Sequence, residues 1–75
     1  MSERLPRITA AQIIRVLELS GYSFSRQSGS HTIYKNNQGR RATVPLHAGV
    51  ILHPKILKSI LRDADLSTEE LKNLL

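Results

Sequence analysis

Residues 22–35 read YSFSRQSGSHTIYK, and this stretch decides the fold class. Bulky side chains alternate with serine or glutamine up to residue 27, and a second alternating run extends from His31 to Lys35. Alternation with a period of two is typical of β-strands. The small pair Ser28-Gly29 interrupts it where a tight turn would lie. The stretch therefore predicts a β-hairpin.

A third strand is predicted beyond the hairpin. The segment Asn36-Asn37-Gln38-Gly39 has the composition of a turn. After it, Ala42 and Val44 alternate with Arg41 and Thr43. We therefore expect three short antiparallel strands joined by tight turns.

The turns also predict which residues face each other. A two-residue loop at Ser28-Gly29 places Arg26 opposite His31, and the second turn places Lys35 opposite Arg40. The side chains then expected to face the core are Phe24, Ile33, Ala42 and Val44. Those expected on the other face are Ser25, Thr32, Tyr34, Arg41 and Thr43. Arg26 and His31 would lie next to each other at the rim of the core-side face.

A first helix is predicted before the sheet, at residues 10–20. Thr9 and Gln12 have the spacing of a capping box. Gly21 can take the left-handed conformation that ends a helix.

Two more helices are predicted after the sheet. Pro54 suits the first turn of a helix, with His53 as an imperfect N-cap. Asp65 stands where glycine often ends a helix. Ser67 and Glu70 form a second capping box, ahead of a short last helix. The expected fold is α+β in the order α-β-β-β-α with a short extra C-terminal helix, the helices lying over one face of the sheet in a single domain spanning residues 1–75.

Composition restricts the classes of function. The chain has 75 residues, no cysteine and a formal net charge of +5, with a pI of about 10.3. Disulfides and thiolate zinc sites are thereby excluded. No apolar run is long enough to span a bilayer, and the polar N-terminus does not resemble a secretory signal, so we expect a cytoplasmic protein.

The charge is unevenly distributed. Between Leu19 and Arg62 there is no Asp or Glu, whereas seven cations fall in the same interval. This pattern favours a polyanionic partner such as nucleic acid, or an acidic protein. A solvated basic surface without a partner is the alternative.

His31 is the candidate catalytic residue. An imidazole among cations can move a proton at a phosphodiester near neutral pH, as base for a ribose 2′-hydroxyl or as acid for the leaving 5′-oxygen. Gly29 would let a phosphate approach the backbone, and Arg26 would stabilise negative charge in the transition state. The alternative is a strand histidine without a catalytic role.

Further residues are candidates for RNA binding. His47 can be a second acid or base, or simply a solvated loop histidine. Lys55 and Lys58 lie near a helix start, where phosphate binds favourably. The full set expected to contact RNA is Arg26, Gly29, Ser30, Lys35, Arg40, Arg41, His47, Lys55 and Lys58. The three histidines lack the spacing of a metal site, so neither metal nor cofactor is expected.

Three segments together resemble the HicA toxin family, also called YcfA-like mRNA interferases. They are Gly21-Tyr22, RQSGSHTIY at residues 26–34, and RATVPLH at residues 41–47. The resemblance runs from the first helix through Leu66. It implies a fold similar to a double-stranded RNA-binding domain and metal-independent cleavage of mRNA, with His31 matching the catalytic histidine.

The resemblance also implies a partner. A HicB-type antitoxin would cover the active site of a monomeric toxin and neutralise it, and its gene would lie beside the toxin gene in a bacterial or archaeal two-gene unit. The chain departs from the family pattern at Pro54-Lys55-Ile56-Leu57, where Pro-Gly-Thr-Leu is common, and at Asp65, where glycine is common. Two other readings remain: a double-stranded RNA-binding module without catalysis, and a degenerate toxin that only binds its antitoxin.

Overall fold

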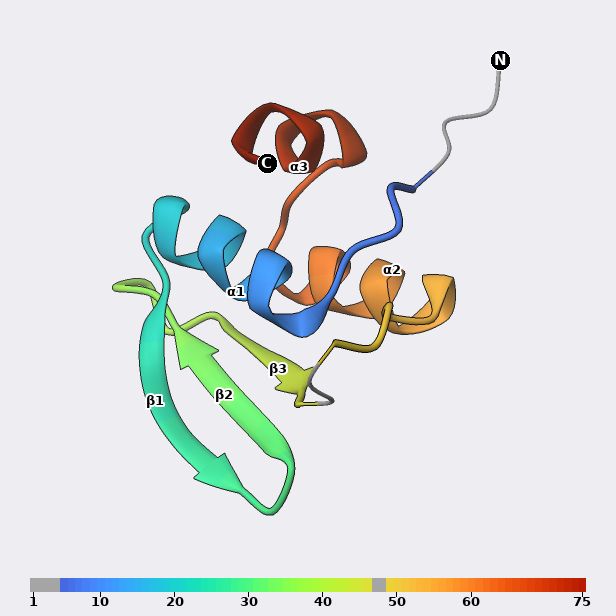
Figure 1. Cartoon of the computed structure of the whole chain (residues 1–75). Coiled ribbons are helices and arrows are strands. Elements are labelled where there is room, and N and C mark those ends of the chain that lie inside the picture. Colours follow the sequence, from blue (N-terminus) through green and yellow to red (C-terminus); the bar gives the residue numbers. More distant parts are fainter. Residues whose placement is uncertain (1–4, 47–48) are drawn as a thin grey trace.

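A three-stranded antiparallel sheet carries its helices on one side (Figure 1). The computed structural model describes residues 5–46 and 49–75. Its elements are α1 (Ala10–Leu19), β1 (Ser23–Ser28), β2 (His31–Lys35), β3 (Arg41–Pro45), α2 (Pro54–Asp63) and α3 (Thr68–Leu74). The strands are ordered β1-β2-β3, α1 and α2 lie over the sheet, and α3 packs on α1. The predicted α+β layout and element order are confirmed.

The helices begin at the predicted residues, where local hydrogen bonds cap their first turns. In the α1 capping box the Gln12 side chain accepts from the Thr9 backbone N–H at 2.9 Å, and Thr9 Oγ1 accepts from the Gln12 N–H at 3.4 Å. Ser67 and Glu70 make the equivalent pair of bonds at α3, each 3.0 Å long. His53 caps α2, because its Nδ1 accepts the Lys55 N–H at 3.1 Å. These bonds satisfy N–H groups that have no partner within the helix.

The ends of α1 and α2 share one geometry but differ in residue type. Gly21 follows α1 with φ of 93°, and Asp65 follows α2 with φ of 56°. In both cases the next N–H donates back to a carbonyl five residues earlier, from Tyr22 to Leu17 at 2.9 Å and from Leu66 to Leu61 at 2.8 Å. This is the Schellman arrangement, which favours glycine at the left-handed position.

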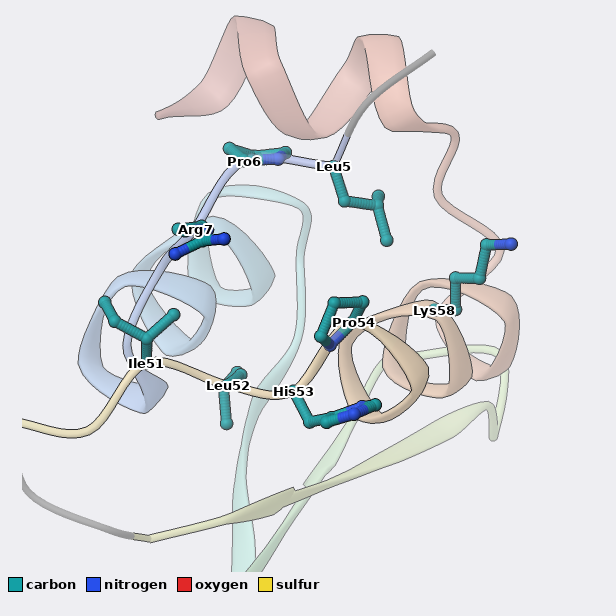
Figure 2. Close-up of a pocket in the computed structure, with 8 residues that line it drawn as sticks. All are labelled: Leu5, Pro6, Arg7, Ile51, Leu52, His53, Pro54 and Lys58. Carbon is teal, nitrogen blue, oxygen red and sulfur yellow. The ribbon is translucent and has the colours of Figure 1, made fainter. Parts of the chain in front are cut away.

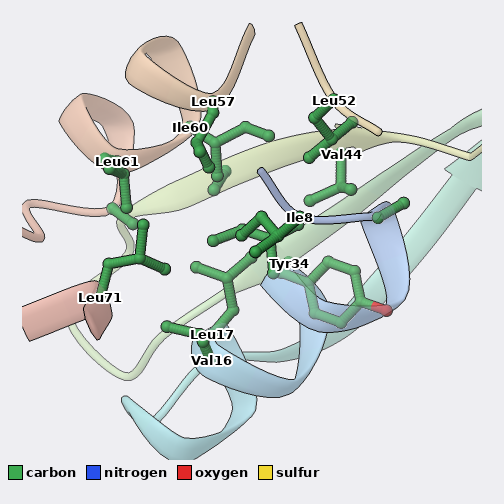
Figure 3. Close-up of a cluster of buried hydrophobic side chains, with 14 of the residues drawn as sticks. Ile8, Val16, Leu17, Tyr34, Val44, Leu52, Leu57, Ile60, Leu61 and Leu71 are labelled. Carbon is green, nitrogen blue, oxygen red and sulfur yellow. The ribbon is translucent and has the colours of Figure 1, made fainter. Parts of the chain in front are cut away.

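The core lies between the helices and the sheet (Figure 3). Each helix and the two strands β2 and β3 contribute to it. Its fully buried large side chains are Ile13, Val16 and Leu17 of α1, Val44 of β3, Leu57 and Ile60 of α2, and Leu71 of α3. β1 contributes none, since all six of its residues are exposed.

The predicted loop of the first hairpin is displaced by one residue, and the partner of each paired residue near it by two positions. Ser28 pairs with His31, so the two-residue loop is Gly29-Ser30, and Arg26 pairs with Ile33 instead of His31. Gly29 has φ of 58° and occupies the first loop position, as in a type II′ turn. The need for a positive φ at that position shifts the loop by one residue from the expected place.

The second hairpin is shifted as well. Lys35 pairs with Arg41, not with Arg40, because the loop has one residue more than predicted. The Asn36 side chain holds this loop by accepting from the N–H groups of Gln38 at 3.0 Å and Arg40 at 2.9 Å. An asparagine that bonds its own following backbone stabilises such turns.

The second shift inverts β2 relative to β3, because a slip of one residue in the pairing moves every side chain to the opposite face. The first shift moves the partner of Arg26 by two positions and therefore keeps the faces matched. Thr32 and Tyr34 face the core, contrary to prediction, whereas Ala42 and Val44 do so as predicted. The hydroxyl of Thr32 is satisfied by the Val44 carbonyl at 3.0 Å, which permits its burial. The remaining predicted core residues lie outside the core. Ile33 is half-buried on the open face. Phe24 is 56% exposed, and its ring meets the Tyr34 ring edge-on with the two centroids 5.9 Å apart.

Within residues 5–46 and 49–75, no helix has both the length and the apolar character that crossing a membrane requires.

Candidate nucleic-acid interface

The sheet face turned away from the helices is basic. The observed register places His31, Ile33 and Lys35 of β2 on this open face, because Thr32 and Tyr34 point to the core. Arg26 is paired with Ile33 and Arg41 with Lys35, so both arginines share the open face. All three cations are exposed. Their proximity creates the positive potential that attracts a phosphate backbone.

His31 is the first residue of β2 and is exposed on this face. The prediction that it lies on the core-side face is wrong, because the pairing of β2 with β3 is shifted by one residue. Arg26 is its diagonal neighbour across the strand pair, two positions along from Ser28. Diagonal side chains lie roughly 7–8 Å apart, within the reach of an arginine.

The turn before His31 is open. A Cβ added at Gly29 would meet no atom within 4 Å, so the positive φ, and not close packing, requires glycine there. Ser30 is held through its backbone, where its carbonyl accepts the Leu46 N–H at 2.6 Å. The backbone around His31 is therefore fixed to the end of β3 while the turn itself remains accessible.

A groove of about 330 Å³ contains His31. Thr43 and Pro45 of β3 form one side with it, and three residues of α2 form the other: Ile56, Ser59 and Ile60. Except for the imidazole, this lining is apolar or hydroxylated. Sequence reasoning missed Thr43, Ile56 and Ser59, since only the register and the packing of α2 beside β3 bring them to His31. Ile56 is 41% exposed although it is a large apolar residue.

Arg40 is held against the end of α2. Its Nε donates to the Asp63 carbonyl at 3.1 Å, and its NH2 group donates to the Arg62 carbonyl at 3.3 Å. Cations are favourable at a helix C-terminus, where carbonyls lack partners. The structure thus gives Arg40 a structural contact that separates it from the cations of the open face.

A second groove lies at the start of α2 (Figure 2). It has a volume of about 540 Å³. The N-terminal segment forms one wall, tied to the chain ahead of α2 by a bond from the Leu52 N–H to the Ile8 carbonyl at 2.8 Å. Arg7 and Lys58 are its cations, and His53 lines it. This larger groove lacks His31, and the ring of His53 is engaged as the helix cap, so the smaller groove is the better candidate for chemistry.

The predicted site residues on α2 do not line the groove that contains His31. Lys55 is exposed in the first turn of α2, and Lys58 is exposed beside the larger groove. His47 lies outside the described residues. Among the residues that the structure describes, no three side chains of the metal-binding types gather into a cluster.

Tyr34 belongs to the core. Burial raises the pKa of its phenol above the ordinary value of 10.0, the Glu18 carboxylate raises this pKa further, and a hydrogen bond with Thr32 lowers it. Its neutral ring is 6% exposed. The expectation that Tyr34 shares the outer face of the sheet with Arg41 is therefore wrong.

Comparison with known proteins identifies the family. A family model described as "HicA toxin of bacterial toxin-antitoxin" matches residues 10–66, which include the whole sheet, α1 and α2. The chain belongs to the HicA toxin family. A search of curated proteins finds no match. The resemblance found in the sequence is thus confirmed at the level of the family, which is a family of toxins of toxin–antitoxin systems.

Proposed function

We propose that this HicA-family protein is an endoribonuclease that cleaves mRNA by acid–base catalysis through His31. The observation that carries the proposal is the position of this imidazole. It is exposed, it lines a groove, and it lies on a basic sheet face within a segment that contains no Asp or Glu. Such a surface attracts RNA and leaves the imidazole free to meet it.

The proposed reaction is a transesterification. The ribose 2′-hydroxyl attacks the adjacent phosphorus, the bond to the 5′-oxygen breaks, and the products are a 2′,3′-cyclic phosphate and a 5′-hydroxyl. His31 would either take the proton of the 2′-hydroxyl or give one to the leaving 5′-oxygen. Arg26, on the same face, would stabilise the charge that builds up on the phosphate oxygens. Lys35 and Arg41 would hold neighbouring phosphates.

The proposed partner is a HicB-type antitoxin. Membership of the toxin family supports an antitoxin as the partner. We propose that one antitoxin covers the open face around His31 of a monomeric toxin, since that would block the groove and neutralise the basic surface together. Co-expression should restore growth, and the antitoxin should compete with RNA for the purified toxin.

The decisive experiment compares His31→Ala with the wild-type protein in RNA cleavage and growth arrest. We expect cleavage to fall by about 10²–10⁴-fold, the usual contribution of a general acid or base. His53→Asn is the matched control, because it removes another exposed imidazole while asparagine keeps the helix cap. Product ends should carry a 2′,3′-cyclic phosphate. Undiminished cleavage by His31→Ala would refute the catalytic role.

A chelator separates this mechanism from metal-assisted hydrolysis. We expect cleavage to be unchanged in excess chelator, whereas loss of activity there would indicate a metal site.

A double-stranded RNA-binding module is the second candidate. Lys55 and Lys58 favour it, since both are exposed near the N-terminus of α2, where phosphate contacts are favourable. Such a module recognises duplex shape and does not need His31. Tight binding of duplex without cleavage, unaffected by His31→Ala, would support it over the nuclease.

A further inference from the structure

The groove beside His31 has a shape and a chemistry that the cleavage step alone does not require. We propose that it takes one unpaired base of the RNA, next to the link that is cleaved, so that the substrate must be single-stranded at that point. This inference rests on the proposed nuclease function and adds to it a specificity subsite.

The lining of the groove fits a flat, neutral group. Its volume of about 330 Å³ falls in the usual range of small-molecule sites, about 300–1,000 Å³. Pro45 and Ile56 offer apolar surface, and the Thr43 and Ser59 hydroxyls can each donate or accept a hydrogen bond. A nucleobase needs this combination, because its faces are apolar and its edges carry donors and acceptors. A phosphate in the same place would meet no cation other than a protonated imidazole.

Cations border the groove without lining it. On α2, Lys55 lies one turn before Ser59 and Arg62 lies nearly one turn after it, and residues so spaced share a helix face. On β3, Arg41 lies two positions from Thr43 and points to the same face. Positive charge at the borders and neutral surface within complement a nucleotide whose base enters the groove while its phosphates remain outside.

The position of the groove makes base entry incompatible with a duplex. His31 forms part of its wall, so a base inside it sits beside the phosphodiester that the imidazole would reach. A base in a stacked and paired helix cannot enter such a site unless it leaves the stack, which costs free energy. Single strands present bases that are free to do so.

The first test uses wild-type protein and a short RNA with one mapped cleavage site. The same strand is cleaved free, annealed to its complement, and with one nucleotide at a time replaced by an abasic ribose, which keeps the 2′-hydroxyl. We expect annealing, and loss of one base flanking the cleaved link, to lower kcat/KM by about 10–100-fold, as for lost base contacts elsewhere. Loss of a base several nucleotides away should have little effect.

The second test changes the groove. Ile56→Ala and Ser59→Ala should each raise KM for the intact strand by about threefold to tenfold. The abasic strand should respond to neither change, because it lacks the base. Leu19→Ala is the matched control: it also shortens an exposed apolar side chain of a helix, 56% exposed, but outside the groove. Melting temperatures establish that the variants are folded.

The outcomes separate the subsite from the nuclease. Equal cleavage of the free, annealed and abasic strands would overturn the base subsite, while loss of cleavage in His31→Ala would leave the nuclease intact. Cleavage that survives His31→Ala would overturn both. The subsite would be established by two results together. The loss of kcat/KM is confined to the removal of one flanking base, and the groove variants cleave the abasic strand as well as the wild type does.

Discussion

The two faces of the sheet are made of neighbouring residues yet have opposite chemistry. Thr32 and Tyr34 are buried beneath the helices, whereas His31 and Lys35 are exposed on the other side of the same strand. The covered face is neutral and its polar groups are satisfied, while the open face carries cations and an accessible imidazole. The five residues of β2 therefore stabilise the fold through one face and form part of the candidate site on the other.

Adjacent substitutions on β2 should give the largest contrast in stability. Tyr34→Ala removes a ring that is 6% exposed, and we expect it to lower the free energy of unfolding by about 3 kcal/mol. Ile33→Ala on the open face should lower it by about 1 kcal/mol or less. Urea unfolding measures both. Similar losses at the two positions would contradict the assignment of the faces.

Two consecutive arginines should separate RNA binding from folding. Arg41→Ala removes a cation of the open face, so we expect weaker RNA binding and a log–log salt slope shallower by about 1. Arg40→Ala removes the bonds to the end of α2 and should lower the free energy of unfolding by about 0.5–1 kcal/mol. Binding titrations at several salt concentrations, together with thermal melts, test the pair. If Arg40→Ala changes the salt slope as much as Arg41→Ala does, the two do not have separate roles.

High pH should lower the stability of the folded protein through Tyr34, which lies on the covered face. The folded state raises the pKa of this phenol above 10.0, which means that folding favours the protonated ring. Its contribution to stability is therefore complete below pH 10.0 and declines as the pH rises through the raised pKa. Tyr34→Phe should show a shallower alkaline decline in stability than the wild type. Parallel declines in urea unfolding at rising pH would argue against this role.

The smallest change in stability is expected from a substitution at the end of α2. Asp65 adopts φ of 56°, a conformation that glycine takes without strain. Asp65→Gly should raise the free energy of unfolding by about 0.5 kcal/mol and leave RNA cleavage unchanged, since the residue belongs to the helix layer. Thermal melts and a cleavage assay check the two halves of this prediction. A change in cleavage would mean that the helix layer influences the open face.

The candidate site illustrates what could be predicted from the sequence. The sequence predicts Arg26 and His31 side by side on the core-side face and Arg41 on the other face, whereas in the structure all three share the open face with Lys35. Arg40 has a contact that no pattern indicated, because its partners are carbonyls more than 20 residues away. The residues opposite His31 in the groove come from α2 and could not be found from spacing.

The sequence by itself determined the element order, the capping boxes, the turn glycines and the left-handed helix ends, because each depends on hydrogen bonds and dihedral angles within a few residues. Only the tertiary structure decided the strand register and therefore the face on which each β2 side chain lies. A strand repeats every two residues, so one extra residue in the second turn inverts β2 relative to β3, and the alternation pattern alone does not fix the length of that turn. The groove depends on that register and on α2 packing beside β3, which are contacts between distant parts of the chain.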